Sequence, residues 1–174
     1  MTAKEKIISI ALAEAGYEEA PPNSNKTKYG KFIGMDGVPW CGLFVSWCYA
    51  QAGQTIKGAG LRLGFAGCQY AVANISKWGR KVSEPEAGDV VFYDWNNDGR
   101  YDHTGLFIQW LNKGQKFQAV EGNHSFTNLL KQSYHKKYTL SSVCCACVYG
   151  YLHPLPKLIR WIVSGGGVGS PSFY

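Results

Sequence analysis

The sequence predicts an α+β domain in which N-terminal helices pack on an antiparallel β-sheet. Apolar residues recur at helical spacing in the first half of the chain, whereas after residue 87 they follow the period of strands. Helices first and strands afterwards are typical of the α+β class. Hydrophobic residues make up 45% of the chain and charged residues 17%, which is enough apolar material for an ordinary core.

The length of 174 residues suits one domain of roughly 150 residues followed by a tail. We expect the domain to cover residues 1–154 and a C-terminal tail or linker to cover residues 155–174. The tail contains Ser164-Gly165-Gly166-Gly167, a composition typical of flexible chain.

Three helices are expected in the first half of the chain, over residues 2–16, 41–52 and 66–75. The first opens on a capping-box pattern formed by Thr2 and Glu5, and Gly16 ends it. Residues 17–39 are rich in Pro, Asn and Gly and are expected to form a loop. The second helix has an apolar face that should point inward, formed by Cys41, Phe44, Val45, Cys48 and Ala52.

Four strands are expected afterwards, over residues 89–93, 104–110, 117–121 and 143–152, with a hairpin turn at residues 112–114. Three cysteines, Cys144, Cys145 and Cys147, fall in the last of these strands. Their Cys-Cys-x-Cys pattern lacks the C-x2-C spacing of a zinc knuckle, so we interpret them as buried core residues rather than as metal ligands.

Cys41 is the candidate nucleophile. It stands where the second helix should begin, and the unpaired N–H groups of a helix N-terminus stabilise a thiolate. Its own backbone N–H is a candidate donor to an oxyanion. The alternative is a buried cysteine on an apolar helix face, an interpretation that fits Cys48 and Cys68 well.

His103 is the candidate base, because histidine titrates near neutral pH and this one opens a predicted strand. Glu121 and Asn123 end the next strand of the predicted hairpin, which would bring a carboxylate and an amide close to His103. A cysteine hydrolase needs such a third group to fix the imidazole tautomer. The alternatives are ordinary turn residues at these positions, and three other histidines compete for the role of base: His124, His135 and His153.

Two tryptophans, Trp40 beside Cys41 and Trp95 between the first two predicted strands, are the candidate substrate-binding residues. The segment after Tyr93 also matches the first half of a calcium loop. Its candidate ligands are Asp94, Asn96, Asp98, Arg100 through its carbonyl, and Asp102. The bidentate Glu of such loops is missing, since Gly105 stands in its place, and the alternative is a polar turn. Structural Ca²⁺ is therefore a candidate, and the chemistry itself requires no cofactor.

Four blocks of the sequence resemble, in the same order, those of the CHAP family (cysteine, histidine-dependent amidohydrolase/peptidase), including its phage endolysin-like members. They are Trp40-Cys41-Gly42-Leu43-Phe44-Val45, Gly88-Asp89-Val90-Val91-Phe92-Tyr93, Asp102-His103-Thr104-Gly105 and Val120-Glu121-Gly122-Asn123. The resemblance implies a papain-like α+β fold over roughly residues 3–152 and a peptidoglycan substrate. It also implies Cys41 as nucleophile, His103 as base, Glu121 as the residue that orients the imidazole, and Asn123 as a supporting polar residue. The related NlpC/P60 family usually has an Asp-Cys-Ser-Gly block, from which Trp40-Cys41-Gly42 departs.

The net charge of +6 is concentrated in the last third of the chain, since Glu121 is the last acidic residue. This basic segment suits anionic wall polymers, or is simply a solvated basic face. Nucleic acid is disfavoured because no basic run is interleaved with aromatic residues. Neither a signal peptide nor a membrane span is evident. We therefore expect a monomer made in a host cytoplasm that acts on the cell wall after release or as part of a virion.

The function expected from the sequence is cleavage of an amide or peptide bond of bacterial peptidoglycan, as in a phage endolysin or virion-associated lysin. One alternative is a cysteine peptidase that acts on protein, because the nucleophile chemistry would be the same. Another is a non-catalytic module that binds walls or serves as a structural part of a virion. The presence of Cys41, His103, Glu121 and Asn123 together disfavours the last alternative.

Overall fold

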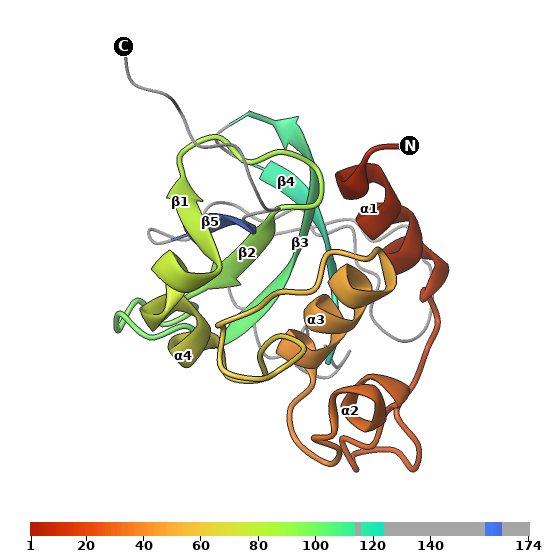
Figure 1. The fold of residues 1–174 in the computed structure, drawn as a ribbon. Helices are drawn as coiled ribbons and strands as arrows, with labels where there is room; N and C mark the ends of the chain where they lie inside the picture. The colour runs from red at the N-terminus through yellow and green to blue at the C-terminus, as the bar shows by residue number, and fades with distance from the viewer. Residues whose placement is uncertain (114–115, 124–158, 165–174) are drawn as a thin grey trace, which may run out of the picture.

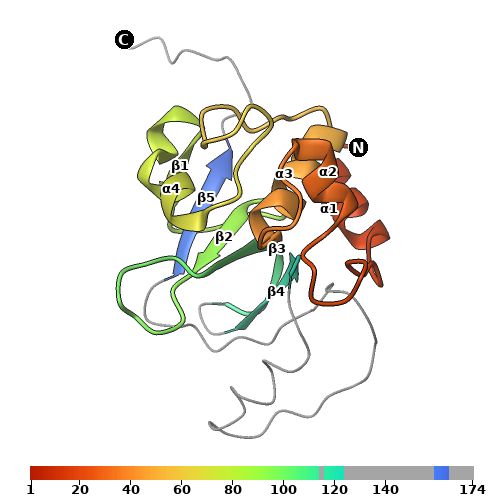
Figure 2. The ribbon, with the colours of Figure 1, turned by 90° about the horizontal axis from the view of Figure 1, so that it is seen from below.

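A computed structural model of the chain describes residues 1–113, 116–123 and 159–164, and it confirms the predicted α+β class. The helices are α1 (Ala3–Ala13), α2 (Lys28–Ile33), α3 (Cys41–Gln51), α4 (Cys68–Ala73) and a 3₁₀ turn, η1 (Ile75–Lys77). The strands are β1 (Gly79–Val82), β2 (Val90–Tyr93), β3 (His103–Asn112), β4 (Lys116–Glu121) and β5 (Ile159–Ser164). The first three helices gather beside β3 and β4, whereas α4 lies at the β1 end of the sheet (Figures 1 and 2).

The strands form one sheet in the order β1-β5-β2-β3-β4, and every neighbouring pair is antiparallel. β5 therefore lies between β1 and β2, with Val82 opposite Trp161 and Val90 opposite Ile162. This corrects the expectation of a tail or linker for residues 159–164, because the edges of β1 and β2 that face each other are both satisfied by this segment. The predicted strand over residues 143–152 and its three cysteines lie outside the described residues.

The local signals of the helix ends explain where the predictions succeed and where they fail. The capping box of α1 is present, with Glu5 N–H donating to Thr2 Oγ1 and Thr2 N–H donating to the Glu5 carboxylate. The helix ends at Ala13, before Gly16. In the segment expected to be a loop, α2 forms because Thr27 caps its N-terminus and Gly34, with φ 84°, ends it. This helix has only six residues, too few to show a helical period.

Helix α3 is the centre of the core. The predicted inward face is buried, and the neighbouring positions Leu43, Ser46 and Tyr49 are buried as well. The helix packs against α1, α2 and β3, so several of its faces are covered and not only the single apolar face that the sequence predicted. None of the helices in the described part of the chain has the length and apolar character needed to cross a membrane.

An ion pair between the partly exposed Lys4 and the buried Asp89 ties α1 to the start of β2. The Asp89 carboxylate is buried and receives Lys4 Nζ at 2.8 Å and the Glu86 N–H at 2.8 Å. Burial lowers the pKa of Lys4, but its hydrogen bonds and charge interactions with Asp89 and Glu86 outweigh burial and raise it. The aspartate of the Gly88-Asp89 block thus holds the first helix to the strand that carries Tyr93.

Candidate active site

Cys41 is the first residue of α3, as the sequence predicted, and the residue is 5% exposed. The pKa of its thiol is held well below the usual range. The largest cause is the S–H group of Cys68, which donates to the thiolate across an Sγ–Sγ distance of 4.0 Å. Burial acts in the opposite direction, and the His103 side chain and the backbone N–H of Gly42 add to the lowering. Cys41 therefore ionises more readily than an ordinary cysteine.

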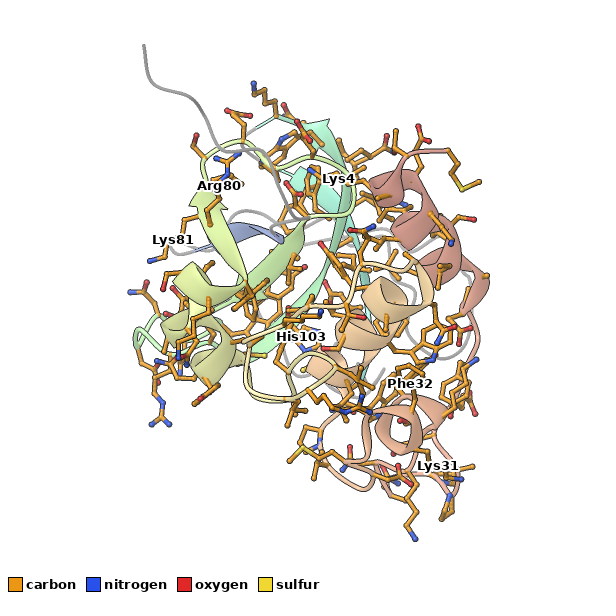
Figure 3. All side chains as sticks on the ribbon, viewed as in Figure 1. Lys4, Lys31, Phe32, Arg80, Lys81 and His103 are labelled. Carbon is orange, nitrogen blue, oxygen red and sulfur yellow. The ribbon has the colours of Figure 1, made fainter. Side chains whose placement is uncertain are left out.

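His103 opens β3 and is 8% exposed (Figure 3 shows it near the centre of the molecule, beside α3). Its Nε2 lies 3.0 Å from Glu121 Oε2, which leaves Nδ1 as the nitrogen that contacts Cys41. Burial lowers the pKa of His103, but the hydrogen bonds and charges of Cys41 and Glu121 outweigh burial and raise it to about 10. The imidazole is therefore held in its protonated form at neutral pH.

The opposite pKa shifts of Cys41 and His103 describe a thiolate–imidazolium pair. Such a pair supplies a nucleophile that is already ionised and an acid that is already charged, which is the combination that acyl transfer from an amide requires. The thiol at the start of α3 thus contacts the imidazole at the start of β3, and the catalytic roles of the two residues stay predictions.

Glu121 ends β4 and is completely buried. Its carboxylate accepts hydrogen bonds from His103 through Oε2 and from the Tyr93 hydroxyl through Oε1, the second at 2.5 Å. A buried carboxylate with two partners of this kind is fixed in position and holds the imidazole in one orientation.

Gly105 makes room for this carboxylate. It lies opposite Glu121 in the β3–β4 ladder and two residues after His103, so all three residues share one face of the sheet. A Cβ atom at Gly105 would lie 2.5 Å from Glu121 Cγ, which is too close for any side chain there. Gly105, which stands where a calcium loop has its bidentate Glu, is thus the residue that leaves room for Glu121 to reach His103.

Tyr93 is a member of this cluster that the sequence analysis missed. It pairs with His103 across β2 and β3, and its ring stacks on Trp95 with centroids 4.6 Å apart. A tyrosine that ends an apolar strand usually belongs to the core. The contact of Tyr93 with Glu121 can be recognised only when the registers of β2, β3 and β4 are known. The signal that could have found it is the closeness in sequence of the predicted strands 89–93 and 104–110, which the structure pairs.

A protein-family model described as CHAP domain matches residues 33–123, just over half of the chain, and the matched range contains Cys41, His103 and Glu121. The chain belongs to the CHAP family. Membership carries a papain-like α+β fold and hydrolase activity of the amidase or peptidase type on peptidoglycan. Comparison with curated proteins and with solved structures gave no match.

The two candidate substrate-binding tryptophans of this CHAP domain have different surroundings. Trp40 is 4% exposed, stacks on Tyr29 and donates from Nε1 to Glu19, so it supports the start of α3 from within the core. This corrects the prediction for Trp40, because a ring enclosed in this way offers no face to a substrate. Trp95 is partly exposed and lies beside His103, with ring centroids 6.4 Å apart.

Asn123 follows β4 in a left-handed backbone conformation, with φ 59°, and is partly exposed. It is brought to the same end of β4 as Glu121, and its role as a supporting polar residue of the CHAP site stays a prediction. Gly122 between them packs tightly, since a Cβ atom there would lie 2.6 Å from Phe44 Cβ. The end of β4 is thereby held against α3.

In the candidate calcium loop of this CHAP domain, side-chain oxygens accept hydrogen bonds from backbone N–H groups of the same loop. Asp94 accepts the N–H groups of Asp98 and Gly99, and Asp102 accepts that of Trp95. Further bonds of this kind run from Asp98 N–H to Asn96 Oδ1 and from Arg100 N–H to Asp98 Oδ1. Within the described ranges, no three His, Cys, Asp or Glu side chains group as metal ligands would. These bonds are those of a polar turn, and calcium binding stays a prediction.

If calcium binds this loop, titration should release or absorb heat and the midpoint of thermal unfolding should rise with calcium concentration. The matched control is Asp98→Asn, which removes one charge from the loop and should weaken the response. Identical melting curves in calcium and in chelator, with no heat of titration, would rule the site out.

Proposed function

We propose that this CHAP domain is a cysteine-dependent peptidoglycan hydrolase that cleaves an amide or peptide bond, with Cys41 as nucleophile and His103 as acid and base. The observation that supports the proposal best is the buried set of contacts that runs from Cys41 through His103 and Glu121 to Tyr93. A structural role alone does not account for a thiol with a lowered pKa beside an imidazole with a raised one.

The reaction follows from the geometry of the pair. The Cys41 thiolate attacks the carbonyl carbon, and the negative charge on the carbonyl oxygen is stabilised by the N–H groups at the start of α3. The His103 imidazolium then protonates the leaving amine, and a thioester remains on Cys41. Water, activated by the neutral His103, attacks the thioester and releases the acid. Glu121 keeps the imidazole in place through both halves, and Tyr93 keeps Glu121 in place.

The experiment that tests the proposal is digestion of purified peptidoglycan followed by mass spectrometry of the fragments. Amide or peptide cleavage produces new amino and carboxyl termini and leaves the number of reducing sugar ends unchanged. New reducing ends, or intact walls beside digested casein, would contradict it, the second result in favour of a peptidase that acts on protein. The masses also identify the bond, either the muramoyl–alanine amide or a link in the peptide stem or cross-bridge.

We further propose that the enzyme serves as a phage endolysin or virion-associated lysin, made in a host cytoplasm and acting as a monomer on the wall after release or within a virion. CHAP domains occur in such proteins, and the basic charge of the last third of the chain suits anionic wall polymers. Retention on purified walls that is unchanged at high salt would contradict the electrostatic part.

Replacing Trp95 with Ala should raise KM for wall fragments about fivefold, which corresponds to about 1 kcal/mol of lost stacking, and should change kcat less. The reason is that Trp95 is the partly exposed ring beside His103. The control is Leu111→Ala, an exposed apolar residue near the other end of β3. Equal kinetics of Trp95→Ala and the parent enzyme would remove Trp95 from the substrate site.

A further inference from the structure

Two cysteines from different elements meet at the candidate active site. Cys41 opens α3 and Cys68 opens α4, and their sulfurs are 4.0 Å apart although 27 residues separate them in sequence. Both residues are buried, with 5% and 6% of their surface exposed. A disulfide needs the sulfurs at about 2.05 Å, so an approach of about 2 Å separates the two thiols from a covalent bond.

The segment before Cys68 is fixed to α3, which holds the two sulfurs in register. Ser46 Oγ accepts the Phe65 N–H at 2.9 Å and donates to the Gly42 carbonyl at 2.7 Å. Gly42 permits the close approach, because a Cβ atom there would lie 2.6 Å from the Ala66 carbonyl oxygen. The proximity of Cys68 to Cys41 is therefore built into the packing of the segment on the helix.

The two thiols differ in reactivity in the way that a peroxide-sensitive pair requires. Cys41 is the thiol of lowered pKa, which favours the thiolate, and thiolates are the form that peroxides oxidise. Cys68 is kept protonated, since the hydrogen bond to Cys41, burial and the Cys41 charge all raise its pKa. Once the Cys41 sulfur is oxidised, it no longer carries the negative charge that holds the proton on Cys68. Cys68 can then lose its proton and attack the oxidised Cys41 sulfur beside it.

We propose that Cys68 is the resolving cysteine of a reversible thiol switch, in which hydrogen peroxide oxidises Cys41 and a Cys41–Cys68 disulfide then blocks the nucleophile. In the first step the Cys41 thiolate attacks one peroxide oxygen, the O–O bond breaks, and a sulfenic acid and hydroxide form. In the second step the Cys68 sulfur attacks the Cys41 sulfur, the S–O bond breaks, and the hydroxyl group leaves as water with the Cys68 proton. A dithiol reductant returns both residues to thiols.

The covalent product is read by mass spectrometry, independently of hydrolysis. Peroxide-treated protein, digested with trypsin without reduction, should give a linked pair of peptides covering residues 32–57 and 63–77, which separates on reduction. The first peptide also contains Cys48, so Cys48→Ala should keep the linked pair and Cys41→Ala should lose it. A peroxide-treated protein in which Cys41 reaches sulfinic acid with no linked pair, or in which Cys48 forms the link, would overturn the proposal.

The activity measurement rests on the proposed function of Cys41. Peroxide should slow wall clearing by the parent protein at least about tenfold, because the nucleophile is consumed, and a dithiol should restore it. Cys68→Ala, compared with its own untreated rate, should lose activity that the dithiol does not restore, since Cys41 proceeds to sulfinic acid. Full recovery of Cys68→Ala would overturn the switch. If the Cys41–Cys68 disulfide forms in a protein that does not clear walls even when reduced, the thiol switch is supported and the proposed hydrolase function is refuted.

Discussion

Replacing Cys41 with Ala is expected to lower the rate of wall clearing by about 10⁴–10⁶-fold, that is, to abolish it in practice. In the proposed mechanism the Cys41 thiolate forms the covalent intermediate, and among the described cysteines Cys41 is the one whose pKa is lowered. The rate should be followed by loss of turbidity of a wall suspension and by release of new amino termini.

Cys48→Ala is the matched control for this variant. Cys48 lies on the same helix and is fully buried, but burial, the largest cause, raises the pKa of its thiol, which makes it a core residue without nucleophilic character. It should retain most of the activity, with a small loss of stability. Wall clearing by Cys41→Ala at the rate of the parent protein, with an unchanged circular dichroism spectrum, would refute the mechanism.

Glu121→Gln is expected to reduce kcat/KM by about 10²–10⁴-fold and to move the alkaline limb of its pH profile to lower pH. The carboxylate is among the groups that raise the pKa of His103, so its neutral substitute lets that pKa fall. The imidazolium is then lost at a lower pH as the solution is made alkaline. The acid limb, which follows protonation of Cys41, should move less, because Cys41 owes its lowered pKa first to Cys68.

Two further variants separate charge from position in this experiment. Glu84→Gln changes an exposed carboxylate that pairs with Lys113 and should leave the profile unchanged. Tyr93→Phe keeps the Glu121 charge and removes the hydroxyl that fixes it, so it should lower the rate with a smaller shift of the alkaline limb. An alkaline limb in Glu121→Gln identical to that of the parent enzyme would exclude Glu121 from control of the imidazole.

The central part of the fold and site was predictable because its signals are local. Apolar residues at helical spacing indicated α3, and short runs rich in apolar residues indicated β2, β3 and β4. The pairing of β3 with β4 then brings Glu121 to His103, as the hairpin hypothesis required. Residue types with distinctive chemistry at strand and helix ends were enough to indicate these contacts.

The contacts that sequence analysis missed depend on distant segments. β5 pairs residues about 80 positions apart in sequence, and no local pattern indicates which strands it joins. Cys68 meets Cys41 only because Ser46 and Gly42 fix the intervening segment. The error at Trp40 has the same origin, since its partners Tyr29 and Glu19 come from the segment interpreted as a structureless loop.

The position of β5 has a consequence for biosynthesis. Because β5 lies between β1 and β2, β1 has no neighbouring strand and β2 lacks one of its two until residues 159–164 have been synthesised. Long-range pairing of this kind forms slowly, and the unpaired edges of β1 and β2 can meanwhile pair with strands of other chains. The sheet therefore stays incomplete while the long segment between β4 and β5 is being made, and a fragment cut at residue 123, the end of the family match, would leave β1 unpaired and one edge of β2 open.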